Sequence, residues 1–183
     1  MASKALPSQD VLRQLLDYDP ETGALTWKAR DVSLFKVGKQ PVEQSAATWN
    51  TRYAGRPALS TIDPNGYYFG PVLDVQYRAH RVIWKWVTGE DPQFIDHING
   101  LRRDNRIENL RSVTRSENNR NKATRTDSAS GALGVVWHKG GKKWMVRVGT
   151  SYIGLFETFS EAATARQSAQ IAMGYHPNHG RVA

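Results

Sequence analysis

Residues 94–121 decide the fold expected for this chain of 183 residues, and they read FIDHINGLRRDNRIENLRSVTRSENNRN. The stretch opens with a short apolar strand that is interrupted by two polar residues, Asp96 and His97. The dipeptide Asn99-Gly100 then predicts a tight turn. An arginine-rich polar segment follows, and residues 109–113 have the composition of a second strand. The stretch therefore predicts two strands joined by a basic loop.

A helix is expected directly after the second strand. Thr114 and Glu117 have the spacing of a capping box, in which the threonine hydroxyl accepts from the first-turn amides and the glutamate reaches back. This pattern predicts that a helix starts near residue 115. Strand, loop, strand and helix together make a ββα unit.

Four polar side chains of this unit suggest phosphodiester hydrolysis. His97 and Asn109 are 12 residues apart, and Asn109 and Asn118 are 9 apart. A hard divalent cation prefers oxygen ligands, which the Asp96 carboxylate and the Asn118 amide offer. A histidine that is neutral near pH 7 can deprotonate an attacking water, and His97 is the candidate. Taken alone, Asp96-His97 would be read as a buried hydrogen-bonded pair.

The pattern resembles the H-N-H nucleases, also called ββα-metal nucleases, and is most similar to their phage homing-type branch. The residues that carry the resemblance are His80-Arg81, Asp96-His97-Ile98-Asn99-Gly100, Asp104-Asn105-Arg106, Glu108-Asn109-Leu110-Arg111 and Ser116-Glu117-Asn118-Asn119-Arg120-Asn121. The resemblance implies a metal-dependent DNA endonuclease of phage or mobile-element origin. It further implies that His97 is the general base, that Asp96 and Asn118 hold the metal, and that Asn109 braces the loop without touching it.

Two features distinguish this site. Asn118 stands where many members of the family have histidine, which favours Mg²⁺ or Mn²⁺ over Zn²⁺ or Ni²⁺. Neighbouring residues on a strand point to opposite faces, so Asp96 and His97 are expected at a strand end or an irregularity. Asn105 is interpreted as a turn residue, and His80 as a structural residue or a phosphate contact.

The C-terminal segment predicts a second small module. Three short strands are expected over 134–138, 143–148 and 152–156, followed by a helix behind a capping box at Thr158 and Glu161. This module resembles the APETALA2-type DNA-binding domain. The resemblance rests on Gly134-Val135, Lys143-Trp144, Gly154-Leu155-Phe156 and Glu161-Ala162-Ala163. It implies that a three-stranded sheet lies in a DNA major groove.

Strand alternation assigns the two faces of this sheet. The face toward the helix is expected to carry Val135, Val146, Val148 and Ile153. The opposite face would carry Val136, His138, Met145, Arg147 and Tyr152, with Lys139, Lys142 and Lys143 on phosphates. Trp137 and Trp144 fit a core role and a DNA contact equally well. In the nuclease loop Arg102, Arg103 and Arg106 would clamp phosphates, the alternative being a solvated basic loop.

Charge and composition agree with a nucleic-acid partner. The net charge is +8, and residues 96–147 alone contribute +7. Concentrated positive charge without an apolar anchor indicates nucleic acid, and a solvated basic surface is the alternative. Cysteine is absent, which excludes disulfides and thiolate zinc sites and fits an intracellular protein. No apolar run approaches the ~20 residues of a membrane span, and no secretory signal is recognised.

The N-terminal half is less informative. Residues 8–28 predict a short helix, a turn and a strand, whereas residues 29–66 predict an irregular, loop-rich segment. A hairpin is expected around Gly70-Pro71. Residues 79–88 predict a helix that ends at Gly89.

The expected fold is therefore α+β, with an irregular N-terminal accessory module over 1–75 and a ββα-metal nuclease over 76–123. A linker over 124–131 and the APETALA2-type module over 132–183 complete it. His176 and His179 are interpreted as non-ligands. The expected partner is double-stranded DNA, with no small-molecule cofactor beyond the metal, and the chain is expected to be a monomer or weak dimer. A non-catalytic DNA-binding protein or regulator is the alternative, and RNA binding is a weaker one.

Overall fold

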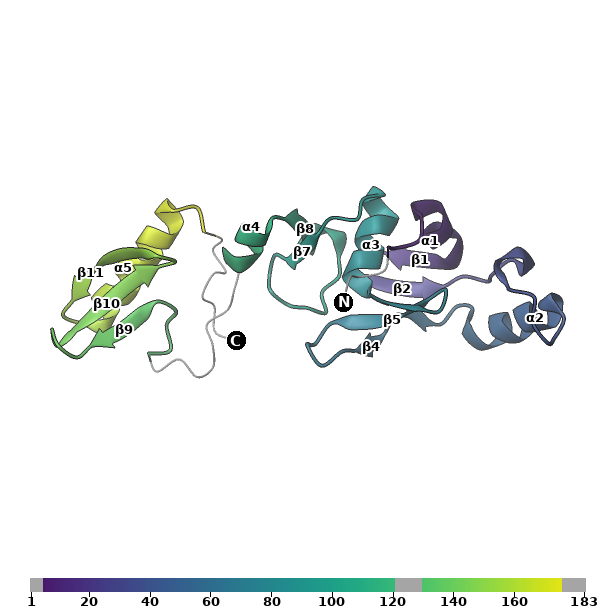
Figure 1. Ribbon diagram of the computed structural model, residues 1–183, viewed down its shortest axis with the longest axis horizontal. Coiled ribbons are helices and arrows are strands. Elements are labelled where there is room, and N and C mark those ends of the chain that lie inside the picture. The colour runs from purple at the N-terminus through teal and green to yellow at the C-terminus, as the bar shows by residue number, and fades with distance from the viewer. Residues whose placement is uncertain (1–4, 121–129, 176–183) are drawn as a thin grey trace. The chain divides into compact units, whose positions relative to one another are not determined.

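The computed structural model describes residues 5–120 and 130–175. The chain divides into two compact units. The first contains residues up to 97 together with 101–112, and the second contains residues 98–100 and those from 113 onward. Figure 1 shows the elements of both. Most of the predicted linker and both C-terminal histidines, His176 and His179, lie outside the described residues.

The first unit begins with a helix and a three-stranded sheet. Helix α1 (Gln9–Leu15) starts at Ser8, whose side chain accepts from the amide of Val11. Strands β1 (Leu16–Asp19), β2 (Ala24–Trp27) and β3 (Pro57–Ala58) form an antiparallel sheet in the order β1-β2-β3. The predicted helix, turn and strand are confirmed, and β1 is an additional strand.

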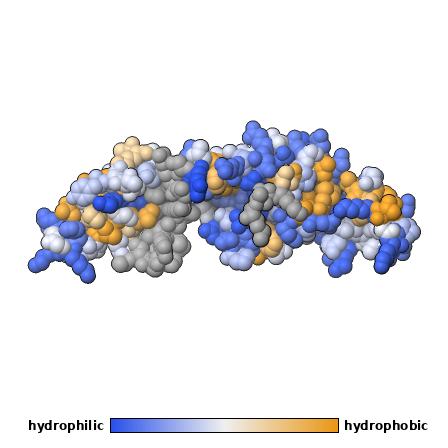
Figure 2. Space-filling view, in the orientation of Figure 1, coloured by the Kyte–Doolittle hydropathy of each residue, from blue (hydrophilic) through white to orange (hydrophobic). Residues whose placement is uncertain are grey.

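Residues 29–66 are more regular than the sequence indicated. They contain a short 3-10 helix, η1 (Val32–Leu34), strand β4 (Thr61–Ile62) and the twelve-residue helix α2 (Val42–Tyr53). The prediction of an irregular segment was wrong for α2. Val42, Ala46, Trp49 and Tyr53 lie on one face of this helix, and Trp49 and Tyr53 pack against the main core. The glycines and prolines on either side of the helix are typical of loops and obscured this pattern. Hydrophobic residues reach the surface near α2 (Figure 2).

The second sheet contains the predicted hairpin with its turn displaced. Strand β5 (Tyr68–Val72) runs through Gly70-Pro71 and pairs with β4 and with β6 (Val75–Arg78). The turn lies at Leu73-Asp74, where both residues have positive φ, instead of at Gly70-Pro71. Gly70 is needed inside the strand because a Cβ there would lie 2.8 Å from the Leu59 Cα.

Helix α3 (Ala79–Thr88) joins the N-terminal elements to the two strands of the ββα unit. It ends at Gly89, whose φ of 79° confirms the predicted stop. The Gln9 side chain of α1 donates to the Trp86 carbonyl at 3.0 Å, across 77 residues of sequence. The main core takes buried residues from both ends of this unit: Leu12, Leu15, Leu16, Leu25, Trp27, Ala58, Leu59, Val72, Ala79, Val82, Ile83 and Leu110.

The predicted ββα elements are present. Strands β7 (Phe94–His97) and β8 (Leu110–Val113) form a two-stranded sheet, and a 3-10 turn, η2 (Ile107–Asn109), precedes β8. Helix α4 (Arg115–Arg120) follows. Both hydrogen bonds of the predicted capping box are made. The Thr114 backbone amide donates to the Glu117 carboxylate at 2.7 Å, and the Glu117 backbone amide donates to the Thr114 hydroxyl at 3.2 Å.

The second unit contains a sheet of β9 (Val135–His138), β10 (Lys143–Val148) and β11 (Ser151–Phe156), in the order β11-β10-β9. Helix α5 (Phe159–Ala172) starts at the predicted capping box of Thr158 and Glu161. Val135, Val146 and Ala162 are the buried centre of this unit. The α+β class is confirmed. None of the described helices has the length and apolar character needed to cross a membrane.

Candidate active site

His97 is the last residue of β7 and is buried, with 4% of its surface exposed. Its Nε2 atom lies 3.0 Å from the Oδ1 atom of Asn105, which is only 2% exposed. An amide oxygen is an acceptor only, so this contact requires that Nε2 carry the hydrogen. The lone pair of the neutral ring is then on Nδ1, the atom that can accept a proton.

Asn105 is thus a buried partner of His97, and its interpretation as a turn residue missed this role. It lies eight residues after His97 in the polar loop. Asparagine is common in turns, and no spacing rule separates a turn asparagine from one that folds inward. The resemblance includes Asp104-Asn105-Arg106, but nothing in that motif indicates a contact with His97.

A second histidine and a tyrosine pack against His97. The ring centroids of His80 and His97 are 5.2 Å apart, and Tyr67 lies 5.1 Å from His80 and 5.8 Å from His97. Burial, with smaller electrostatic effects from His97, Arg78 and Arg81, lowers the pKa of His80 to about 3. Burial also lowers the pKa of His97, against the opposing effect of its bond to Asn105. Both rings are therefore neutral near pH 7.

Asp96 lies beside His97 and is paired with an arginine of the neighbouring strand. The Asp96 Oδ2 atom accepts from Arg111 at 2.8 Å and 3.2 Å, and the Asp96 side chain is 12% exposed. The partners of Asp96 and His97 thus lie on different segments, β8 and the loop. No sequence feature singles out Arg111, because any arginine of this basic stretch could be the partner.

Asn109 makes a hydrogen bond within the loop that precedes β8. Its Nδ2 atom donates to the Asp104 carbonyl at 2.8 Å, and the residue is 6% exposed. This is the kind of contact expected of a residue that braces the loop. The hydroxyl of Tyr18, from β1, bridges the same loop: it donates to the Asn105 carbonyl at 3.1 Å and accepts from the Ile107 amide at 2.8 Å.

The three loop arginines have different surroundings. Arg106 pairs with Asp104 and with Glu108, each at 2.8 Å, and the bond to Asp104 raises its pKa further above the ordinary arginine value. Arg102 donates to the Asn65 carbonyl at 2.5 Å. Arg103 is exposed. Contact with DNA stays a prediction for all three, and Arg106 would have to exchange its carboxylate partners for a phosphate.

Asn118 belongs to the second unit, where its backbone amide donates to the Thr114 carbonyl at 3.0 Å. Its place in a metal site with Asp96 stays a prediction. Among the described residues no three His, Cys, Asp or Glu side chains gather as metal ligands. One carboxylate and one amide still fit a hard cation such as Mg²⁺, which keeps several waters and often binds through one or two carboxylates and substrate phosphates.

The sheet of the second unit has the two faces expected from alternation. Val135, Val146 and Val148 are buried, and Ile153 packs against the same core. Trp144 packs there too and contacts Trp137, which is 47% exposed, at a ring distance of 5.2 Å.

The predicted DNA-binding side chains of this sheet differ in their contacts. The residues Val136, His138, Lys139, Lys142, Arg147 and Tyr152 are exposed. His138 accepts from the Gly141 amide at 2.9 Å, and Lys143 pairs with Glu157 at 2.7 Å. Met145 is half-buried. Their contact with DNA stays a prediction.

Comparison with known proteins supports a nuclease. Residues 77–120 match the family model described as HNH endonuclease. Protein 3.8 of Escherichia phage T7 is 33% identical over 69 residues, which cover 37% of this chain and 57% of that protein. The chain thus spans a little over half the length of this curated relative. No solved structure matches the chain.

Proposed function

We propose that this protein is a metal-dependent DNA endonuclease that hydrolyses phosphodiester bonds, with His97 as the general base. The observation that carries the proposal is the buried, neutral His97, held by Asn105 beside the ion-paired Asp96. The match of residues 77–120 to the HNH endonuclease model supports a nuclease or DNA-binding role for this segment. The homing-type character and the intracellular setting stay predictions.

His97 would act through Nδ1. The hydrogen on Nε2 is fixed by the Asn105 oxygen, so the ring presents its lone pair on the other nitrogen. A water placed there loses its proton to Nδ1 as its oxygen attacks phosphorus, and general-base help of this kind contributes about 10²–10⁴ in rate. The Asn105 oxygen also accepts from the imidazolium that results.

Asp96 and Asn118 are the residues that would hold the cation, Mg²⁺ or Mn²⁺. Arg111 fixes the orientation of the Asp96 carboxylate through two hydrogen bonds. When bound, such a cation supplies stabilisation for the charge that develops on the phosphate and on the leaving 3′ oxygen.

The second unit would bind double-stranded DNA in the manner of the APETALA2-type module that it resembles. Lys139, Lys142, Arg147 and Tyr152 are exposed and available for this contact. One catalytic unit cuts one strand, so the expected product of a monomer is a nick, and a double-strand break needs a dimer or two successive nicks.

The test is conversion of supercoiled plasmid to open circles by the purified protein. Cutting should require Mg²⁺ or Mn²⁺, stop in EDTA, and fall by about 10²–10⁴ in His97→Ala. Asp96→Asn should require more metal for the same rate. Asp10→Asn, an exposed aspartate of α1, is the matched control and should cut normally.

Two outcomes separate the proposal from its rival. If neither plasmid nor phage-sized genomic DNA is cut under any metal while the wild-type protein and His97→Ala both still retard DNA on a gel, the non-catalytic DNA-binding function or an unmet site requirement explains the result, and a Mg²⁺-binding titration separates the two. If His97→Ala cuts as fast as the wild type, another residue is the base.

A further inference from the structure

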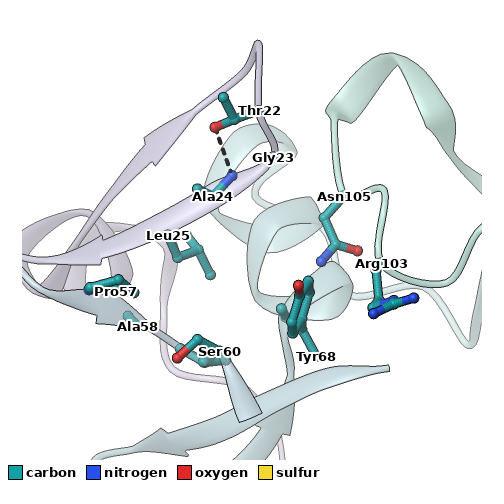
Figure 3. A pocket seen from close by; sticks show the side chains of 12 residues that line it. Thr22, Gly23, Ala24, Leu25, Pro57, Ala58, Ser60, Tyr68, Arg103 and Asn105 are labelled. Atoms are coloured by element: carbon teal, nitrogen blue, oxygen red, sulfur yellow. Dashed lines mark hydrogen bonds between the residues drawn. The ribbon is translucent and has the colours of Figure 1, made fainter. Parts of the chain in front are cut away.

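A pocket of about 310 Å³ has Asn105, but not His97, among its lining residues, and the proposed hydrolysis does not use it. Figure 3 shows the residues that line it, which come from β2, β3, β5 and the nuclease loop. Leu25, Ala58 and Leu59 are buried residues of the main core and give the pocket apolar walls.

The Asn105 side chain contributes a hydrogen-bond donor to this pocket. Its oxygen is occupied by His97, whereas its Nδ2 has no hydrogen-bond partner in the part of the chain that the structure describes. In Figure 3 the amide nitrogen points to the Tyr68 side of the pocket and the oxygen points away. Nδ2 is not among the buried polar atoms that lack a partner, so it is open to water in the pocket, and a ligand with an acceptor oxygen can take the place of that water.

Other polar groups of the pocket also lack partners. The hydroxyls of Tyr68 and Ser60 make no hydrogen bond with any residue that the structure describes. The one charged side chain among the described lining residues is Arg103, and no carboxylate is among them. The pocket thus offers an aromatic ring, three polar groups and a positive charge, and it does not repel an anion.

We propose that this pocket binds one unstacked nucleobase of the DNA strand that the site cleaves, with a base carbonyl on Asn105 and the adjoining phosphate on Arg103. This inference rests on the proposed function. The volume is at the lower end of the range for ligand sites, roughly 300 Å³, and suits one small planar ring system. Flipped bases are held in this way by stacking on aromatic side chains and by hydrogen bonds to their edges.

The proposal gives the pocket a role in positioning His97. A base carbonyl bound to Nδ2 fixes the Asn105 amide, and the other end of the same amide holds the His97 ring. The ring is therefore best oriented when a base occupies the pocket. Adenine, which has no carbonyl oxygen, should be the least effective occupant.

Binding can be tested without cleavage, by NMR of the full-length protein in EDTA. The side-chain amide signal of Asn105 is assigned by its loss in Asn105→Asp. Deoxynucleoside 5′-monophosphates should shift this signal, with thymidine monophosphate more effective than its adenine counterpart, and deoxyribose 5-phosphate should not. The proposal is overturned if no nucleotide moves the signal, or if the sugar phosphate moves it equally.

Filling the pocket should remove the shift. Ser60→Trp places a large ring among the lining residues, and Ser60→Gln is the milder second variant. Thr48→Trp, at an exposed position of α2 outside the lining, is the matched control and should leave the shift intact. A shift that survives both Ser60 variants in folded protein would place the base elsewhere and overturn the proposal.

Cleavage gives the last test and separates this proposal from the proposed function. Synthetic duplexes lacking one base at a time next to the mapped nick should reveal one position whose loss slows nicking about ten- to hundredfold. If the wild type nicks DNA and no single base matters, the pocket proposal fails and the nuclease stands. If nucleotides shift Asn105 but no DNA is cut, the nuclease proposal fails and the pocket binds bases in a DNA-binding protein.

Discussion

Asn105 holds the ring of His97 through a single amide oxygen, so its removal should act on the base and not only on the fold. We expect Asn105→Ala to slow plasmid nicking about a hundredfold, because small misplacements of reacting groups cost that much. The ¹⁵N signals of the His97 ring should change from the Nε2–H tautomer to a mixture. Asn105→Asp keeps an acceptor oxygen and should recover part of the rate.

Asn65→Ala is the control for this substitution, since Asn65 is exposed and only its backbone groups make hydrogen bonds in the described structure. Unchanged nicking and an unchanged tautomer in Asn105→Ala would show that Asn105 fills space beside His97 without positioning it.

His80 makes stability depend on pH. Its pKa is lowered to about 3 in the folded state, whereas an unfolded histidine titrates near 6.5. Between these pH values the unfolded chain binds more protons than the folded protein. The contribution of neutral His80 to the free energy of unfolding is therefore fully present above pH 6.5 and is lost as the pH falls toward 3. We expect the free energy of unfolding to fall by about 1 kcal/mol per pH unit in this window.

Urea unfolding at several pH values measures this dependence. His80→Leu should make it less steep, with the remainder due to groups such as His97 whose pKa is also lowered, and His138→Leu, at an exposed histidine, should leave it as in the wild type. The same slope in His80→Leu and in the wild type would assign the effect to another group.

The spacing of Asp96, His97, Asn109 and Asn118, together with the family resemblance, suggested phosphodiester hydrolysis from the sequence, and the roles of these four residues stay predictions. The partners of these residues were not predictable. Asn105 and Arg111 reach His97 and Asp96 only after the loop folds back. Their identity depends on the path of the loop, which the sequence pattern does not specify.

At the scale of elements, the turn between β1 and β2 should be sensitive to a single methyl group. A Cβ at Gly23 would lie 2.6 Å from the backbone of Asn105 and Arg106. We expect Gly23→Ala to lower stability by about 1–3 kcal/mol and to slow nicking, since it displaces the segment that holds His97. Thermal unfolding and the plasmid assay measure the two effects.

Gly55→Ala is a closely matched control. Gly55 has a φ of 76°, nearly the 74° of Gly23, but no atom lies within 4 Å of its added Cβ. Both variants suffer the strain of positive φ, and only Gly23→Ala suffers the clash. Equal losses in the two variants would refute a special role for the approach of this turn to the loop.

Elements with local signals were predicted well, and those set by distant contacts were not. Both capping boxes and the glycine stop of α3 are local, and all three are confirmed. Helix α2 was missed although Val42, Ala46, Trp49 and Tyr53 repeat on one face, because the glycines and prolines that flank it are typical of loops. The hairpin turn was misplaced because Gly70 and Pro71 are typical turn residues, although here the close approach of Leu59 requires the glycine within a strand.

At the scale of the whole molecule, the uneven charge should govern affinity for DNA. The segment 96–147 carries +7 of the net +8. Binding should therefore weaken steeply with salt. We expect the double variant Lys139→Gln with Lys142→Gln to reduce the slope of log K against log salt by about 2, because each lysine that no longer meets a phosphate lowers the slope by roughly one.

Fluorescence anisotropy with a labelled duplex at several salt concentrations gives this slope. Lys36→Gln with Lys39→Gln removes the same charge from exposed positions of the first unit and should change the slope much less. Equal reductions in both double variants would mean that net charge, and not the sheet of the second unit, sets the affinity.

The core shared by α1, α3 and β8 has a consequence for how the chain is made. Gln9 bonds to Trp86 across 77 residues, and a ribosome adding 5–20 residues per second needs roughly 4 to 15 s to synthesise that interval. During this time the nascent helix α1 can pack on β1 and β2 but lacks its contact with α3. Asn105 emerges later still, so a polypeptide released early from translation has a His97 without the amide that positions it.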